Sequence, residues 1–531
     1  MNSLWWQDVI FYQIYPLSFK DSNDDGMGDL EGIIQKLDCV KSLGIGAIWL
    51  SPIYTSPMAD FGYDVADYCN IDRRFGNLLL FDRLLEESHK RGMRVVMDFV
   101  PNHSSDRHPW FVESASSRDN PKRDWYIWRD PKPNGNPPNN WLSFFGGPAW
   151  TLDETTGQYY MHTFLPEQPE LNWRNPKVRE AMYNAMRFWF DREVDGFRID
   201  VVGFLFKDEQ FRDDPPNPNY ITRHDNPYDS LLHTQSCFQP EVYDVLRAFR
   251  QVANEYTDRV LIGEVTMVNF KYLSNFYGEK NDRLHLPFNF YLLYLPWDAK
   301  TYRQCIDAYV GTLPKGAWPN YVLGNHDSQR LASRLGTAQA RVAAMLLLTL
   351  RGTPFIYYGE ELGMTNGVIS YEKQKDPQGL RLPGIILNRD LCRTPMQWNS
   401  TLHAGFSRGE PWLPVAPGYN IANLQTEESD PHSFLSLYRR LAKIRREQKG
   451  IQMGTYRSIQ NIPDECFVYA REAKGSKILV ALNFSGNNQH FALSNKAARG
   501  RVILSTHLDR EGNESLAEFM LRPHEGCIIA T

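Results

Sequence analysis

Short apolar runs alternate with amphipathic helical patterns over most of the chain. Eight runs have the length and the β-branched or aromatic content of buried strands: 9–15, 46–52, 93–100, 194–202, 259–265, 285–290, 320–325 and 354–361. The clearest helical patterns lie between them, at 30–44, 81–92, 177–191, 240–256 and 338–350. Eight alternating β/α units predict an α/β fold, a (β/α)8 TIM barrel.

Two parts of the chain depart from this alternation. The stretch 104–173 is rich in Pro, Asn, Asp and Trp, which predicts a subdomain inserted after the third strand. After about residue 455, short strand patterns follow one another without helices, which predicts a C-terminal antiparallel β domain, a β-sandwich. The expected division is a barrel in two parts, 1–103 and 174–454, the insert at 104–173, and a C-terminal domain at 455–531.

Composition narrows the classes of partner. The chain has 531 residues, a formal net charge of −5 and no long basic run, which argues against nucleic acid or an anionic membrane as partner. No signal peptide is expected at the N-terminus, and no segment approaches the roughly 18 apolar residues of a membrane span. The 7 scattered cysteines favour a reducing, cytoplasmic location. We expect a monomer or a weak homo-oligomer.

Four acids stand at or just past the ends of predicted strands: Asp98, Asp200, Glu264 and Asp327. The carboxyl ends of parallel strands meet at one rim of a barrel, so these side chains are expected to converge there. Converging acids repel one another and are costly unless chemistry requires them. Cleavage of a glycosidic bond is the reaction that most often requires paired carboxylates.

The residues around these acids refine the hypothesis. Arg198 lies two positions before Asp200 and on a strand would share its face, which keeps a nucleophilic carboxylate ionised. The alternative is a structural ion pair inside the barrel. Glu264 follows an apolar run, where a carboxylic acid can stay protonated and act as a general acid. His103 and His326 each lie near a strand-end acid, although a lone histidine is more often a packed core residue.

Several motifs make the chain resemble a known family. DFVPNH, GFRIDVVGF, GEV and NHD, in this order, resemble the four signature regions of the α-amylase superfamily, glycoside hydrolase family thirteen. QPELNW at 168–173 resembles its fifth region. WWQDVIFYQIYPLSF near the start and RTPMQW at 393–398 resemble the α-glucosidase and oligo-1,6-glucosidase branch. The resemblance covers essentially the whole chain.

The resemblance implies roles for individual residues. Asp200 would be the nucleophile, Glu264 the acid/base, and Asp327 the residue that holds sugar hydroxyls and stabilises the transition state. The implied substrate-binding residues are Asp60, Tyr63, His103, Arg198, His326 and Arg393. Asp60 together with Arg393 would grip O4 of the terminal glucose and so enforce exo action, with Arg389 as the alternative partner.

The implied activity is that of a retaining, exo-acting α-glucosidase on short oligosaccharides and disaccharides, acting through a covalent glucosyl-enzyme. A transglucosylase or sucrose isomerase with the same residues is the alternative. A non-catalytic partner resembling the transporter heavy chains is remote, because all three acids are present and no span is expected. Val201 is typical of α-1,6-cleaving relatives, whereas the long polar stretch 205–236 and LHLPFNF resemble α-1,4-preferring relatives. We expect a slight preference for α-1,4 linkages.

A possible metal site lies near the N-terminus. The loop 21–29 spaces oxygen donors at alternate positions, which suits Ca²⁺ or Mg²⁺. The candidate ligands are Asp21, Asn23, Asp25, the Met27 carbonyl and Asp29. The loop is not an EF-hand because its twelfth position is Gly32, and a solvated acidic turn is the alternative. The resemblance implies a structural calcium here, which would stabilise the fold rather than take part in catalysis.

Overall fold

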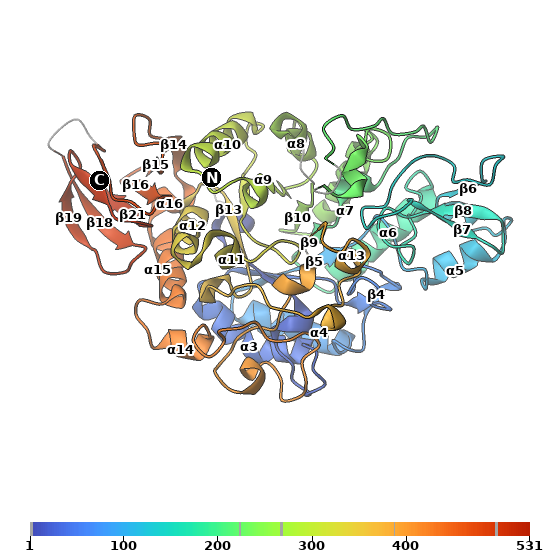
Figure 1. Cartoon of the computed structure of the whole chain (residues 1–531), viewed down its shortest axis with the longest axis horizontal. Helices are drawn as coiled ribbons and strands as arrows, with labels where there is room; N and C mark the ends of the chain where they lie inside the picture. The colour runs from blue at the N-terminus through green and yellow to red at the C-terminus, as the bar shows by residue number, and fades with distance from the viewer. Residues whose placement is uncertain (1–3, 222–224, 266–268, 387, 494–497) are drawn as a thin grey trace.

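The computed structural model describes residues 4–221, 225–265, 269–386, 388–493 and 498–531. Eight parallel strands form one curved sheet in the order β11-β10-β9-β5-β2-β1-β13-β12, with the helices outside it (Figure 1). The strands are β1 (Phe11–Ile14), β2 (Ala47–Leu50), β5 (Arg94–Phe99), β9 (Gly196–Ile199), β10 (Val260–Gly263), β11 (Leu286–Pro287), β12 (Asn320–Val322) and β13 (Thr353–Tyr357). The predicted barrel is confirmed.

The barrel has a seam between β11 and β12, which are the two ends of this order. The sixth strand is shorter than predicted because Pro287 has no N–H to donate to a ladder. The side chain of Asn320 spans the seam, donating to the Pro287 carbonyl at 2.6 Å and accepting the Asn289 N–H at 3.4 Å. The seam is therefore closed by a side chain rather than by a strand ladder.

Amphipathic helices surround the sheet. The first of them, α3 (Leu30–Ser42), begins where Asp29 accepts the N–H of Gly32, and it buries Ile33 and Leu37 in the main hydrophobic core. The other long helices of the barrel are α4 (Leu78–Lys90), α6 (Pro176–Phe190), α7 (Val242–Asn254), α8 (Phe270–Tyr277), α10 (Ala299–Thr312) and α12 (Thr337–Thr349). The shorter helices are α1 (Trp5–Asp8), α2 (Pro16–Phe19), α9 (Tyr291–Tyr294), α11 (Leu331–Leu335), α13 (Pro377–Arg381) and α14 (Leu424–Glu428).

The segment between β5 and α6 forms a lobe at one end of the molecule, on the right in Figure 1. It contains α5 (Pro109–Ser116) and an antiparallel sheet in the order β6-β8-β7, made of β6 (Trp128–Arg129), β7 (Trp150–Asp153) and β8 (Gln158–Met161). A two-stranded ribbon, β3 (Tyr54–Thr55) with β4 (Asp67–Ile71), precedes it in the chain. Among its described residues, the polar stretch 205–236 contains a short 3-10 helix, Pro227–Ser230.

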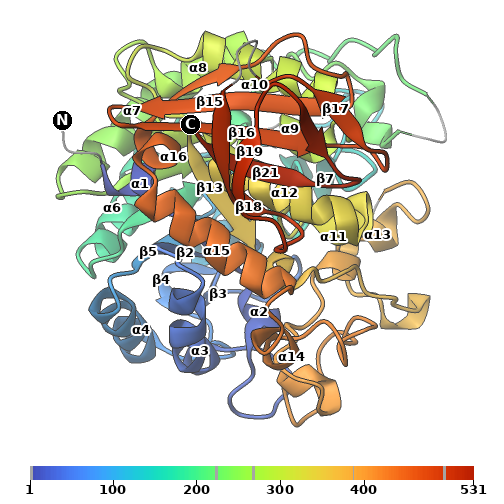
Figure 2. The ribbon, with the colours of Figure 1, turned by 90° about the vertical axis from the view of Figure 1, so that its left-hand side faces the viewer.

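An antiparallel sheet follows the barrel and faces the viewer in Figure 2. Helices α15 (Phe434–Glu447) and α16 (Lys449–Met453) lead into it, and its order is β14-β15-β16-β21-β18-β19. Its strands are β14 (Thr455–Ser458), β15 (Cys466–Ala473), β16 (Ser476–Asn483), β18 (Arg499–Ser505), β19 (Gly512–Ser515) and β21 (Gly526–Ala530). A separate pair joins β17 (Gln489–Phe491) and β20 (Phe519–Leu521). Within the described ranges, no helix is long and apolar enough to cross a membrane.

Candidate active site

The register of neighbouring strands brings three of the predicted acids together. Ile199 of β9 lies opposite Gly263 of β10, and the backbone N–H of Glu264 donates to the Ile199 carbonyl at 2.8 Å. On the other side, the N–H of Asp200 donates to the carbonyl of Phe99 at 2.8 Å. Asp200 and Glu264 are thus the next residues of adjacent strands, and Asp98 lies one strand further along.

Arg198 is the centre of this acidic group. Its Nη1 donates to Asp98 Oδ1 at 2.6 Å and to Asp200 Oδ1 at 2.8 Å, and its Nη2 contacts Glu264 Oε2. The guanidinium also lies over the ring of Trp49, with its carbon 5.2 Å from the ring centre. A single cation therefore holds three carboxylates in place.

Burial and mutual repulsion raise the pKa values of Asp200 and Asp98. Burial raises the pKa of Asp200 well above its ordinary value, Arg198 opposes the rise, and the neighbouring Glu264 adds to it. Burial likewise raises the pKa of Asp98 to about 6, against the opposing charge of Arg198. Within this balance the charge of Arg198 favours the ionised form of Asp200, which a nucleophile requires.

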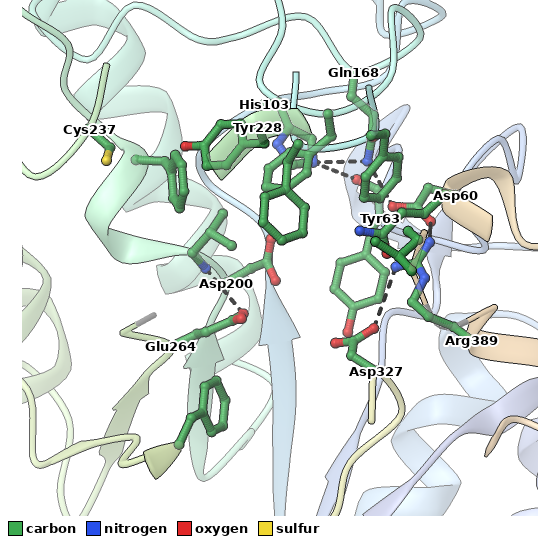
Figure 3. A pocket seen from close by; sticks show the side chains of 18 of the residues that line it. Asp60, Tyr63, His103, Gln168, Asp200, Tyr228, Cys237, Glu264, Asp327 and Arg389 are labelled. Carbon is green, nitrogen blue, oxygen red and sulfur yellow. Dashed lines mark hydrogen bonds and ion pairs between the residues drawn. The ribbon is translucent and has the colours of Figure 1, made fainter. Parts of the chain in front are cut away.

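Asp327 faces Asp200 and Glu264 from another part of the rim, in the turn after β12 (Figure 3). Arg393 Nη2 donates to its Oδ1 at 2.8 Å, and His326 Nε2 lies 3.2 Å from its Oδ2. Burial raises the pKa of Asp327, but His326, Arg393 and Arg389 outweigh burial, so the pKa ends below its ordinary value. Asp327 is therefore ionised throughout the neutral range.

The arginine paired with Asp60 is Arg389, the alternative to Arg393, so the pairing of Asp60 with Arg393 is wrong. Arg389 Nη2 donates to Asp60 Oδ1 at 2.7 Å, and Asp376 accepts both the backbone N–H of Arg389, at 2.7 Å, and its Nε, at 2.9 Å. Arg393 is fully buried and donates from Nε to the His326 carbonyl at 2.8 Å. Its guanidinium is thus already bound behind the cavity wall.

The predicted histidines and Tyr63 form the floor and one side of the site. The Tyr63 hydroxyl lies 2.7 Å from His326 Nε2 and 3.1 Å from Asp98 Oδ2, and its ring stacks on His326. His103 Nε2 lies 3.1 Å from the Tyr63 carbonyl and 3.2 Å from Gln168 Nε2. Burial lowers the pKa of His103 to about 4 and that of His326 to about 3, so both imidazoles are neutral at neutral pH.

A cavity of about 620 Å³ lies between these groups (Figure 3). Of the predicted site residues, those that line it are Asp60, Tyr63, His103, Asp200, Glu264, His326 and Asp327. Arg198 and Arg393 are absent from its wall, because both guanidinium groups are buried against the acids. These two arginines orient the carboxylates and favour their ionised forms, but they do not line the cavity. The expectation that they contact the substrate is therefore wrong in this structure.

Most residues of the remaining cavity wall were not predicted from the sequence. The additional polar residues are Gln168, Asp229, His233, Asn325 and Gln378, and the aromatic ones are Phe144, Phe145, Phe164, Phe204, Tyr228, Phe238, Phe290 and Tyr294. The aromatic content of the insert was the available signal, since aromatic faces suit sugar rings. Gln168 lies in the QPELNW motif and donates to Asp60 Oδ2 at 3.3 Å. An apolar cavity with a few convergent polar groups is the usual form of a small-molecule site.

The predicted metal loop folds around its own acids. Asp21 accepts the N–H groups of Asn23 at 2.9 Å and Gly26 at 2.8 Å, and Asp25 accepts that of Met27 at 2.9 Å. Asp29 caps α3. The loop contains the hard oxygen donors that Ca²⁺ prefers, but in this arrangement these oxygens accept backbone N–H groups. The carboxylates of the loop do not form a group of three potential metal ligands close to one another. Calcium binding stays a prediction.

Among the described residues, the group of three potential ligands that does gather, within 4.8 Å, is His507, Asp509 and Glu525 in the C-terminal sheet domain. Arg522 donates to Asp509 at 2.6 Å and to Glu525 at 2.6 Å. The guanidinium already neutralises these carboxylates, so the group is accounted for without a metal.

Known proteins resemble this chain over nearly its whole length. The family described as alpha amylase, catalytic domain, matches residues 13–454. The chain is 40% identical to an oligo-1,6-glucosidase of Halalkalibacterium halodurans over 99% of both chains, and 41% identical to a probable alpha-glucosidase of Rhizobium meliloti over 97% of this chain and 94% of that one. The solved alpha-glucosyl transfer enzyme XgtA has a TM-score of 0.94 at 38% identity, and trehalulose synthase MutB of Pseudomonas mesoacidophila 0.92 at 36%, each over 100% of both chains.

Proposed function

Because the chain belongs to the α-amylase family of glycoside hydrolases, we propose that it is a retaining, exo-acting α-glucosidase. Its substrates are short oligosaccharides and disaccharides with a terminal non-reducing α-linked glucose. One observation carries the proposal: the guanidinium of Arg198 contacts the carboxylates of both Asp200 and Glu264, and both acids line the same cavity.

Asp200 serves as the nucleophile and Glu264 as the acid/base. Retaining glycosidases hold their two carboxyl groups about 5–5.5 Å apart, whereas inverting enzymes need a wider gap for a water molecule. Asp200 and Glu264 contact the same guanidinium and therefore lie close together, which supports the retaining arrangement.

The reaction then has two displacements. Asp200 attacks the anomeric carbon while Glu264 protonates the glycosidic oxygen, so the bond to the leaving group breaks and a β-linked glucosyl-enzyme forms. Glu264 next takes a proton from water, which attacks the same carbon and releases α-glucose and the Asp200 carboxylate. Asp327, held ionised by its cationic neighbours, accepts hydrogen bonds from the sugar hydroxyls and stabilises the positive charge of the transition state.

The ion pair of Asp60 and Arg389 provides the exo specificity. Both residues line the cavity, and the pair is buried, with side chains 6% and 8% exposed. Charged groups at this position suit the free O4 hydroxyl of a terminal glucose and leave no passage for a further sugar. The enzyme therefore removes one glucose at a time.

A second candidate function uses the same intermediate with another acceptor. The likeness to a glucosyl transfer enzyme and to a trehalulose synthase favours a transglucosylase or sucrose isomerase as the alternative. A non-catalytic role like that of the transporter heavy chains is disfavoured, because the acids are assembled. The two candidate functions differ in the acceptor: the glucosyl-enzyme reacts with water in a glucosidase and with a sugar in a transglucosylase or isomerase.

For the linkage we propose a slight preference for α-1,4 bonds, together with activity on other α-linkages. Val201, the residue type of α-1,6-cleaving relatives, lines the cavity, and its N–H lies 3.4 Å from Glu264 Oε2. The polar stretch 205–236, which resembles α-1,4-preferring relatives, adds Tyr228 and His233 to the same wall. Initial rates on maltose, isomaltose, sucrose and trehalose, with products separated by chromatography, decide both linkage and acceptor.

We further propose a reducing, cytoplasmic location, which the free state of all seven cysteines supports. The partner is a small oligosaccharide, and the protein acts as a monomer or weak homo-oligomer. A structural Ca²⁺ at loop 21–29 is also proposed, and the donor chemistry of the loop supports it.

Proton NMR of the first-formed product tests the proposed function. With maltose or p-nitrophenyl α-glucoside as substrate, the anomeric signal of α-glucose should appear first and that of β-glucose only later, through mutarotation. If β-glucose appears first, the mechanism is inverting and the assignment of Asp200 fails. If every gluco-disaccharide stays intact, the glucosidase activity itself is excluded.

A further inference from the structure

A buried lysine joins the barrel to the inserted segment just outside the cavity wall. Lys207 is 1% exposed, and its ammonium donates to Glu170 Oε2 at 2.7 Å, to Asn102 Oδ1 at 3.4 Å and to the Phe204 carbonyl. Glu170 belongs to the insert, Asn102 follows β5, and Phe204 follows the strand that carries Asp200. One cation therefore connects three segments that build the site.

The contacts continue from this ammonium to His103. Asn102 Nδ2 donates to Glu170 Oε1 at 2.9 Å and lies 3.1 Å from His103 Nδ1. Because the amide donates, His103 Nδ1 accepts, and the imidazole carries its hydrogen on Nε2. The backbones of His103 and Glu170 also form an antiparallel bridge. The orientation of His103 in the cavity wall thus depends on Asn102 and Glu170, and these depend on Lys207.

The charges that face His103 are opposed in sign. Glu170 raises the pKa of His103 and Lys207 lowers it, on top of the lowering by burial. The other groups against the ring are neutral: the Tyr63 carbonyl and the amides of Asn102 and Gln168. Removing the ammonium would leave the Glu170 carboxylate buried and uncompensated close to the imidazole, which favours the protonated ring.

We propose that Lys207 is a positioning residue for glucoside cleavage, whose ammonium balances Glu170 and so keeps His103 neutral and oriented with Nε2–H at the cavity wall. The inference rests on the proposed function, because the readout is glucoside hydrolysis. Lys207 itself does not line the cavity, so its effect passes through Glu170, Asn102 and His103.

The pH profile of kcat/KM for p-nitrophenyl α-glucoside tests this role. Lys207→Met keeps a side chain of similar length without the charge. It should lower kcat/KM by about 10²-fold at neutral pH, as a misplaced site residue does, and move the acidic limb of the profile up by about one pH unit. The double variant Lys207→Met/Glu170→Gln removes both charges and should return the acidic limb to the wild-type position, even where its melting temperature stays low.

Two further variants make the test specific. Lys122→Met removes a surface ion pair with Glu113, 2.6 Å long, in the same insert, and should leave the profile unchanged. Glu170→Gln alone should not raise the acidic limb, and this comparison decides the matter where Lys207→Met does not fold. The inference is overturned if the acidic limb of the kcat/KM profile of Lys207→Met lies at the wild-type pH. It is also overturned if the acidic limb of the double variant stays as high as that of Lys207→Met. An inactive wild-type enzyme would instead refute the proposed function.

Discussion

Arg389 donates a hydrogen bond of 2.7 Å to Asp60, although the two residues lie 329 positions apart in the chain. The same guanidinium lies 3.4 Å from Asp327 through Nη1. The group proposed to recognise the free end of the glucose is thus directly connected to the acid proposed to stabilise the transition state. In the proposed function, binding of the free glucose terminus and stabilisation of the transition state are therefore coupled through this one side chain.

Arg389→Lys should therefore lower kcat/KM by about 10²-fold, because an ammonium keeps the charge but loses the planar fork that reaches Asp60, Asp327 and Asp376 together. Most of the loss should appear in KM for maltose. Steady-state kinetics on maltose and maltotriose check this expectation. Wild-type kinetics in Arg389→Lys would return the role to Arg393.

Asp200→Asn should reduce kcat by about 10⁴-fold or more, because an amide cannot form the glucosyl ester. The measurement is p-nitrophenol release, with circular dichroism to show that the variant is folded. Asp119→Asn, an exposed position in the insert, is the matched control and should keep full activity. Residual turnover within tenfold of wild type would remove Asp200 from the nucleophile role.

The buried carboxyl group of Glu360 should make the stability of the folded protein depend on pH. Glu360 is 5% exposed, and both of its carboxyl oxygens lack a hydrogen-bond partner in the described part of the chain. Burial raises its pKa from 4.5 to about 8, and the neighbouring Glu361 adds to the rise. The folded state therefore binds more protons than the unfolded state between these values. This contribution to stability is complete below pH 4.5 and is lost as the pH rises through 8.

Glu360→Gln, which is neutral at every pH, should flatten this loss. Its advantage over wild type should grow from pH 5 to pH 9 and reach the order of a few kcal/mol. Melting temperatures at pH 5, 7 and 9 measure it, with Glu154→Gln on the surface as control. Parallel curves for wild type and Glu360→Gln would show that this carboxyl group is ionised in the folded protein.

Calcium should raise the melting temperature, because a ligand that binds the folded state stabilises it in proportion to RT ln(1 + [L]/Kd). Asp25→Asn changes an exposed loop carboxylate and should reduce the response without changing kcat. Scanning calorimetry with calcium and with chelator provides the measurement. A melting temperature that neither addition alters would identify the loop as a turn closed by its own N–H groups.

Local periodicity was sufficient to predict the barrel. Each strand is a buried apolar run, and the acids that follow the strands meet because parallel strands deliver their carboxyl ends to one rim. Asp200 and Glu264 are the clearest examples, since strand register alone makes them neighbours. The extent of the elements was less predictable. The sixth strand ends at Pro287, and the eighth ends at Tyr357, before the 3-10 helix Glu360–Leu362.

The sequence by itself determined the strand and helix order, the family and the acids that gather at one rim, because these follow from periodicity and from short motifs. Only the tertiary structure decided that Asp60 pairs with Arg389, that Arg198 and Arg393 lie behind the wall, and that Lys207 links the insert to the barrel. Such contacts depend on how distant loops pack over the rim. Packing is set by the sum of many small interactions across the whole fold, which no local pattern records.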